Sequence, residues 1–332
     1  MKKIVNFVFI LFLLIGFFYT PISAGTLKTL VIPEGTKRIK SHTGGIPHQI
    51  TGEVTGDELI ISVKIPNSVK IIDDYAFQGC TYLESINIPN SVTYIGTGAF
   101  MNCQSLKSIN IPNSIKIIEY GTFARCKSLE SINIPNSITE IHKNAFNGCE
   151  SLESINIPNS ITEIGESAFE ECKSLERINI PNSVTKIEYG AFSGCESLES
   201  INIPNSVTYI GGSAFNECKS LENINLPNSI KIIEGRTFVN CQSLESINIP
   251  NSVIKIRYSA FYGCKSLKKI RIPNSVKIIE YRAFYECESL KKITIPNSVI
   301  NIGDEAFYQF NTIYYNGSAK GSPWGAKERK KY

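Results

Sequence analysis

A phrase of 23 residues repeats along most of this chain, and it constrains the fold more than any other feature of the sequence. All ten cysteines recur at the same step, from Cys80 to Cys287. A solenoid grows by stacking near-identical units and has no single closed core, so 332 residues need not divide into several globular domains. Eleven prolines align the repeat: Pro66, Pro89, Pro112, Pro135, Pro158, Pro181, Pro204, Pro227, Pro250, Pro273 and Pro296.

Every copy has the same internal order of residue types, as in residues 83–103, LESINIPNSVTYIGTGAFMNC. The alternation of polar and apolar residues at 85–88 predicts a short strand, and Pro89, which lacks an N–H, ends its hydrogen-bond ladder. Residues 92–95 predict a second extended piece, and the segment after it is too short for more than a turn of helix. One copy cannot bury its apolar residues alone. The pattern therefore predicts about eleven rungs of short parallel strands, stacked about 4.8 Å apart into a rod on the order of 50 Å long.

The spacing L-x-x-I-x-I at residues 83–88 resembles the L-x-x-L-x-L core of leucine-rich repeats. Together with the 23-residue step, "IPNSV", "AF" and "C-x-S-L", it resembles the BspA-like, or Treponema-type, leucine-rich repeats over residues 59–313. Ser91 stands where an Asn or Cys ladder residue is usual, and Pro89 follows the strand directly. The resemblance implies a β-rich solenoid in an exported or surface-exposed microbial protein. Some members of that family are similar to adhesins that bind host matrix proteins, but a fold does not by itself determine an activity.

Residues 1–24 have the pattern of a secretory signal peptide. Lys2 and Lys3 precede an apolar run at 4–18, and Ala24 ends a small-residue cleavage site. The alternative is an uncleaved membrane anchor, but the run is shorter than the ~20 residues of a spanning helix. We expect no stable membrane span after cleavage. Removing both lysines lowers the formal net charge from +4 to +2, too little for a nucleic-acid-binding role by net charge alone.

Both ends of the array depart from the repeat, as the caps of a solenoid do. Residues 25–58 predict an N-terminal cap with a partial repeat and an inserted polar, glycine-rich loop. Residues 314–332 predict a C-terminal cap and a basic tail, with the tail from Lys327 expected to be mobile. Three aromatic residues are candidates to cover the last open rung: Tyr314, Tyr315 and Trp324.

Ten cysteines in an exported chain would ordinarily indicate disulfides. Here each cysteine lies three residues after an inward Phe and three before an inward Leu, so we expect it in the core. Neighbouring copies are close enough to bond, but their parallel Cβ vectors oppose the dihedral angle near 90° that a disulfide needs. We therefore predict buried free thiols, with some inter-rung disulfides as the alternative. A row of thiols without recurring histidines fits neither a metal site nor a nucleophile, so we expect no cofactor.

Two files of polar residues follow the predicted strands, and a file of identical residues supplies no asymmetric catalytic constellation. We therefore expect a non-enzymatic protein. The files form either a ladder of amides that bond along the axis or a binding face for an extended partner. The first file contains Asn87, Asn110, Asn133, Asn156, Asn179, Asn202, Asn225 and Asn248. The second contains Ser85, Ser108, Ser131, Ser154, Ser200 and Ser246.

Charge changes sign along the array. Residues 127–253 contain 8 basic and 16 acidic residues, a net −8, whereas residues 254–300 contain 10 basic and 3 acidic residues, a net +7. This switch provides solubility, a basic patch for an acidic partner, or a head-to-tail contact between molecules. The candidate binding residues are the cations of two adjacent rungs and two loop tyrosines: Lys268, Lys269, Arg271, Lys291, Lys292, Tyr258 and Tyr281.

These patterns together predict a secreted or cell-surface binding protein, an adhesin or interaction scaffold that contacts a host matrix protein or a glycan. The alternative is a passive structural or antigenic surface coat without a dedicated ligand.

Overall fold

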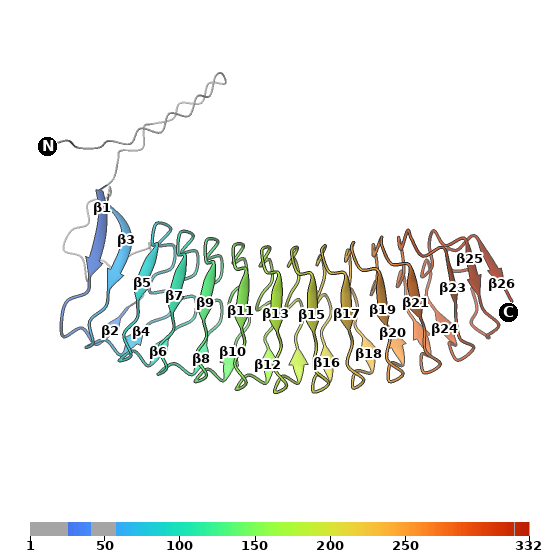
Figure 1. Cartoon of the computed structure of the whole chain (residues 1–332), viewed down its shortest axis with the longest axis horizontal. Coiled ribbons are helices and arrows are strands. Elements are labelled where there is room, and N and C mark those ends of the chain that lie inside the picture. The colour runs from blue at the N-terminus through green and yellow to red at the C-terminus, as the bar shows by residue number, and fades with distance from the viewer. Residues whose placement is uncertain (1–25, 41–57, 322, 332) are drawn as a thin grey trace, which may run out of the picture.

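The computed structural model describes residues 26–40, 58–321 and 323–331. The predicted signal peptide and the inserted loop at 41–57 lie outside the described residues. The described chain forms a rod of stacked turns that contains strands and no helix (Figure 1). The prediction of a β-solenoid with short parallel strands at a 23-residue step is confirmed.

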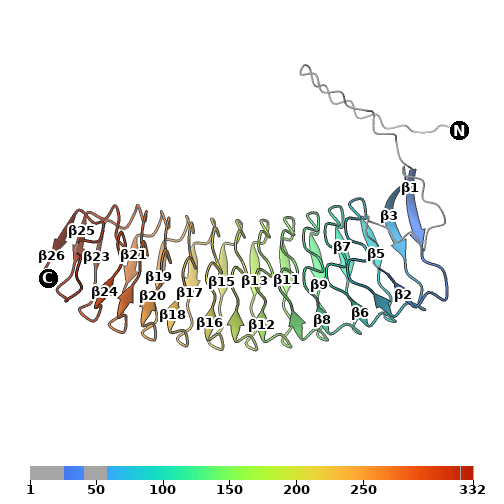
Figure 2. The same cartoon turned by 180° about the vertical axis from the view of Figure 1, so that it is seen from behind.

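Each rung contributes one strand to each of two files, which run side by side along the rod, and Figure 2 shows both files from behind. We call the first file the strand face. It contains β1 (Thr26–Val31), β3 (Glu58–Lys64), β5 (Ser85–Asn87), β7 (Ser108–Asn110), β9 (Ser131–Asn133), β11 (Ser154–Asn156), β13 (Arg177–Asn179), β15 (Ser200–Asn202), β17 (Asn223–Asn225), β19 (Ser246–Asn248), β21 (Lys269–Arg271), β23 (Lys292–Thr294), β25 (Thr312–Tyr314) and β26 (Glu328–Lys330).

The strands of the second file are two residues long. They are β2 (Arg38–Ile39), β4 (Ile71–Ile72), β6 (Tyr94–Ile95), β8 (Ile117–Ile118), β10 (Glu140–Ile141), β12 (Glu163–Ile164), β14 (Lys186–Ile187), β16 (Tyr209–Ile210), β18 (Ile232–Ile233), β20 (Lys255–Ile256), β22 (Ile278–Ile279) and β24 (Asn301–Ile302).

All strand pairs are parallel, and within the repeats like residues lie opposite each other, as in Ile155↔Ile178 of β11 and β13. The strand face is divided into three sheets, β1-β3-β5-β7-β9, β11-β13-β15-β17-β19-β21 and β23-β25-β26. The second file is likewise divided, into β2-β4-β6, β8 to β16 and β18 to β24.

Alternation along each three-residue strand decides what is buried. In β5 the outer residues Ser85 and Asn87 are exposed and Ile86 between them is buried. Ile88 is also buried, but Pro89 follows it and ends the strand. In the segment before each cysteine the chain makes turns instead of helix, and Asn102, for example, adopts a φ of 62°.

A stack of phenylalanine rings runs through the core from Phe77 to Phe307. Neighbouring rings lie nearly parallel with centroids 5.2–5.7 Å apart, within the range of offset stacking. Because each ring is covered by its copies in the rungs before and after it, the core is continuous along the rod.

The cysteines line this stack as buried free thiols, as predicted. Nine of them donate S–H to the carbonyl oxygen of the phenylalanine 26 residues earlier, as Cys103 Sγ does to Phe77 O at 3.2 Å. These nine thiols therefore point at the backbone of the preceding rung and not at the neighbouring sulfur. Burial raises the pKa of every one of these thiols, to about 11 for Cys80 and about 12 for Cys126.

We expect the ten thiols to be unreactive in the folded protein and fully reactive once it is unfolded. Burial removes both access and the thiolate form that attacks a reagent. The measurement is a count of thiols labelled by a thiol reagent without reductant, in native buffer and in denaturant. Two or fewer labelled thiols in denaturant would mean that the row is disulfide-bonded.

Two buried aromatic rings close the C-terminal end. Tyr315 and Trp324 pack edge to face with centroids 5.6 Å apart, and the Arg329 guanidinium lies 4.8 Å from the Tyr315 ring. Tyr314, the third aromatic candidate for this cap, lies instead on the strand face. The expectation of a mobile basic tail is wrong for Glu328–Lys330, because these residues form β26 and pair with β25. The tail is therefore part of the cap.

Candidate binding groove on the strand face

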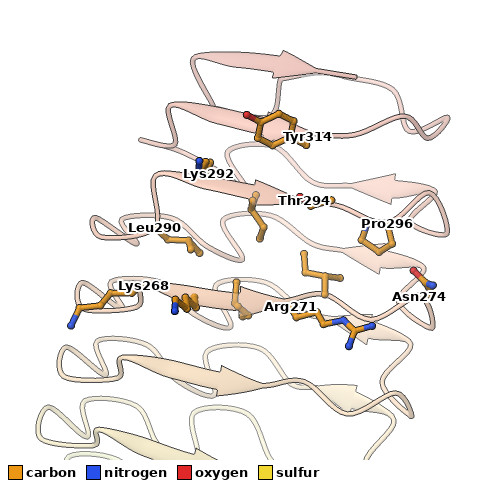
Figure 3. Close-up of a pocket in the computed structure, with 12 residues that line it drawn as sticks. Lys268, Arg271, Asn274, Leu290, Lys292, Thr294, Pro296 and Tyr314 are labelled. Carbon is orange, nitrogen blue, oxygen red and sulfur yellow. The ribbon is translucent and has the colours of Figure 1, made fainter. Parts of the chain in front are cut away.

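An open groove of about 820 Å³ lies on the strand face near the C-terminal end of the rod, where β21 and β23 face each other (Figure 3). Lys269 and Arg271 of β21 and Lys292 of β23 belong to its exposed rim, and Tyr314 of β25 lies beyond them. We call this site the cationic groove. It is lined by Lys268, Lys269, Ile270, Arg271, Ile272, Asn274, Leu290, Lys292, Ile293, Thr294, Pro296 and Tyr314.

The groove coincides with a break in the backbone ladder. β21 pairs with β19 and β23 pairs with β25, but β21 and β23 do not pair with each other. In earlier rungs the residue before the strand donates its N–H to the preceding rung, as Lys268 does to Glu245 O at 3.0 Å, whereas no such bond joins Lys291 to Lys268 within the described residues. The two rungs stay joined at the turn, where Ser289 N–H donates to Lys265 O at 3.1 Å, and through β22 and β24. The opening is thus confined to the strand face.

The burial of the Ile270 side chain shows the same opening. Its counterparts Ile247 and Ile293 are buried, whereas Ile270 is only half-buried. The groove therefore reaches between the two strands, down to aliphatic side chains that the ladder covers elsewhere.

Two features of the sequence meet at this break. Lys269 and Lys292 occupy matching positions in successive rungs, and like charges placed opposite each other destabilise a strand pair. On the other side of β23 the rungs shorten, because Lys292 pairs with Thr312, a step of 20, and Thr312 pairs with Glu328, a step of 16. Charge repulsion therefore opposes the pairing of β21 with β23, and the shortened cap begins directly beyond this break.

Most cations at the groove lack an acidic partner. Lys268 is the exception, because its Nζ lies 2.6 Å from Glu245 Oε1. Glu288, in the same rung as β23, pairs instead with Lys265, whose Nζ lies 3.2 Å from Glu288 Oε1. Over the described chain, no ion pair involves the remaining exposed candidates, Lys269, Arg271, Lys291 and Lys292. The groove therefore presents positive charge that the protein itself does not neutralise.

The two tyrosines predicted for the site do not line the groove. Tyr258 and Tyr281 follow β20 and β22 in the second file, and their side chains are 47% and 43% exposed. The Arg282 guanidinium lies 4.7 Å from the centroid of the Tyr281 ring. The structure thus separates the aromatic candidates from the cations. The sequence interpretation also missed Tyr314, because its position at the end of the array indicated a cap residue.

The asparagine and serine files are exposed along the strand face, as predicted for solvent-facing columns. In the part of the chain that the structure describes, no side-chain hydrogen bond joins neighbouring asparagines of the file. The amide ladder is therefore not formed there, and the exposed amides stay available to other partners.

The described residues offer neither a cluster of metal ligands nor a membrane-spanning helix. No group of three or more His, Cys, Asp or Glu side chains gathers among them as a metal site would require. The described residues form strands and turns, and they contain no helix that is long and apolar enough to cross a membrane.

Comparison with solved structures shows the same architecture in proteins from bacteria. A leucine-rich repeat protein from Bacteroides ovatus is 32% identical, over 81% of this chain and 82% of that one, with a TM-score of 0.60. A leucine rich cell surface protein from Faecalibacterium prausnitzii is 28% identical, over 90% of this chain and 92% of that one, with a TM-score of 0.61. A search of the curated proteins found no match.

The family described as "BspA type Leucine rich repeat region (6 copies)" matches residues 56–176, 139–268 and 231–319. These overlapping segments span the whole array of rungs, and the 23-residue step, the parallel strands and the buried cysteine row lie within them. The chain belongs to the BspA-type leucine-rich repeat family.

Proposed function

We propose that this protein is a non-enzymatic adhesin or interaction scaffold, secreted or held at the cell surface, and that its cationic groove contacts an acidic extracellular protein or glycan. The observation that carries this proposal is the set of unneutralised cations around the opening between β21 and β23: Lys269, Arg271 and Lys292. The signal-peptide pattern supports export, and the similar Faecalibacterium protein is described as a cell surface protein.

Position in the array strengthens the assignment. Most earlier rungs place Ser or Asn where Lys269, Lys292 and Arg271 stand, with Arg177 and Lys64 as isolated exceptions, so stacking does not require cations at these positions. Like charges on adjacent strands cost stability, which makes a cluster of them a candidate for use in binding. Complementary charge mainly accelerates association and selects partners.

The test compares two variants that each remove three positive charges. In the groove variant, Lys269→Ser, Arg271→Asn and Lys292→Ser introduce the residues of the array itself. We expect this variant to bind immobilised matrix proteins or acidic polysaccharides roughly ten-fold more weakly at low salt, because three exposed ion pairs contribute about 0.5 kcal/mol each. The difference should shrink as salt rises, since charges are screened beyond about 8 Å at physiological ionic strength.

The control variant carries Lys116→Thr, Lys231→Thr and Lys277→Thr. These three lysines are exposed and precede strands of the second file, where other rungs carry Thr. Its binding should match that of the unmodified protein. Equal loss in both variants would indicate net charge alone, and an absence of binding to any acidic partner would favour a passive coat protein.

A further inference from the structure

We propose that the cationic groove takes up an extended acidic peptide of a partner protein by strand addition, with the peptide pairing to the free backbone edges of β21 and β23. This inference rests on the proposed function, because it names the partner chemistry and the binding mode of the same groove.

The backbone edges supply the first part of the evidence. Each strand in a parallel sheet shares its N–H and C=O groups between two neighbours. β21 is bonded on one side to β19, with Ile247 opposite Ile270, and β23 is bonded on one side to β25, with Ile293 opposite Ile313. Their facing edges are not paired with each other. A row of unpaired backbone groups is a template for another strand, and peptide recognition by strand addition uses such an edge.

The side chains around the opening predict the sequence of the peptide. Successive side chains of a strand point to opposite faces. On the outer face a bound strand would meet the rim cations, and on the inner face it would meet the aliphatic floor. The matching peptide therefore alternates acidic and aliphatic residues. The side chains that would select this pattern are Lys269, Arg271 and Lys292 at the rim and Ile270 and Ile293 at the floor.

An acidic polysaccharide would use only part of this site. Its carboxylate or sulfate groups can meet the rim cations, but it has no backbone N–H groups at strand spacing and no alternating aliphatic side chains. It would leave the facing edges and the half-buried Ile270 without partners. The unpaired edges therefore favour a peptide over a glycan.

The first experiment measures fluorescence anisotropy of three labelled seven-residue peptides added to the purified protein. One peptide alternates Glu and Val, the second has the same composition with its Glu and Val residues in separate blocks, and the third is the alternating peptide with N-methylated backbone amides. We expect the alternating peptide to bind at least ten-fold more tightly than the other two. Equal affinity of all three would overturn strand addition, because only charge would then be recognised.

The second experiment uses variants and a sulfated polysaccharide as a competing polyanion. Lys269→Ser, Arg271→Asn and Lys292→Ser together should weaken the alternating peptide at least ten-fold, whereas Lys116→Thr, Lys231→Thr and Lys277→Thr together should not. Ile270→Trp should fill the floor and weaken the peptide while leaving polysaccharide binding unchanged. An Ile270→Trp variant that melts like the unmodified protein and still binds the alternating peptide fully would contradict the inference.

These measurements separate the two proposals. If the polysaccharide binds through the groove cations and the peptides show no preference for alternation, strand addition is wrong and the proposed function stands. If the peptides, the polysaccharide and the immobilised matrix proteins all fail to bind, the proposed function is wrong as well.

Discussion

Raising the pH above about 9 should unfold this protein within one to two pH units. Burial raises the pKa of the core thiols above 9.0, the ordinary value, in the folded state. A group whose pKa is raised on folding stabilises the fold fully below its unfolded pKa, and that contribution is lost as pH rises toward the folded pKa. Each thiol then removes about 1.4 kcal/mol per pH unit, so ten together approach about 14 kcal/mol per unit. That loss matches the entire stability of a typical domain, about 5–15 kcal/mol.

The measurement is the free energy of unfolding from urea titrations at several pH values between 8 and 10.5. A variant with Cys126→Ala, Cys195→Ala and Cys264→Ala retains seven of the ten thiols. The three substituted positions lie three rungs apart from one another along the rod. It should be less stable at neutral pH but lose stability about three-tenths less steeply above pH 9, since the slope counts the titrating thiols. An unchanged slope would assign the alkaline unfolding to surface lysines and tyrosines.

Deletion of one whole repeat, residues 175–197, should leave a folded rod that is shorter by one rung. Each rung contacts only its neighbours, and the rungs before and after the deletion present the same residue types to each other. The deletion joins Ser174 to Leu198 and so restores the phrase C-x-S-L at the junction. We expect a single cooperative melting transition close to that of the unmodified protein.

Deletion of only residues 175–186 should be far more damaging, although fewer residues are lost. The remaining half rung cannot complete a turn, and the aliphatic side chains that cover the adjacent rungs are missing. Four buried aliphatic side chains disappear without replacement: Leu175, Ile178, Ile180 and Val184. At about 1.5–3 kcal/mol for each buried aliphatic side chain, the loss is on the order of 10 kcal/mol. Circular dichroism melts of both deletion variants provide the measurement, and equal losses would contradict a stacked solenoid.

The sequence by itself was sufficient for the regular part of the rod. Identical phrases at a constant step can bury their apolar residues only by stacking in register, so Ile86 and its copies had to form a buried column and Ser85 and Asn87 exposed ones. The thiols were predictable for the same reason. Stacked copies point their side chains in parallel, and the structure shows nine of the ten Sγ atoms directed at a backbone carbonyl of the rung before.

Only the tertiary structure decided where that regularity ends. The sequence places Lys292 one 23-residue step after Lys269, but it does not show whether β21 and β23 pair. That outcome depends on the balance between the ladder hydrogen bonds and the repulsion of like charges across the strands, at the point where the shortened C-terminal rungs begin. The same balance exposes Ile270, brings Tyr314 to the groove and leaves Tyr258 and Tyr281 in the other file. A constant repeat predicts the contacts between rungs of the same sequence. At the end of the array the neighbouring rungs differ in sequence, and their contacts are seen only in the folded chain.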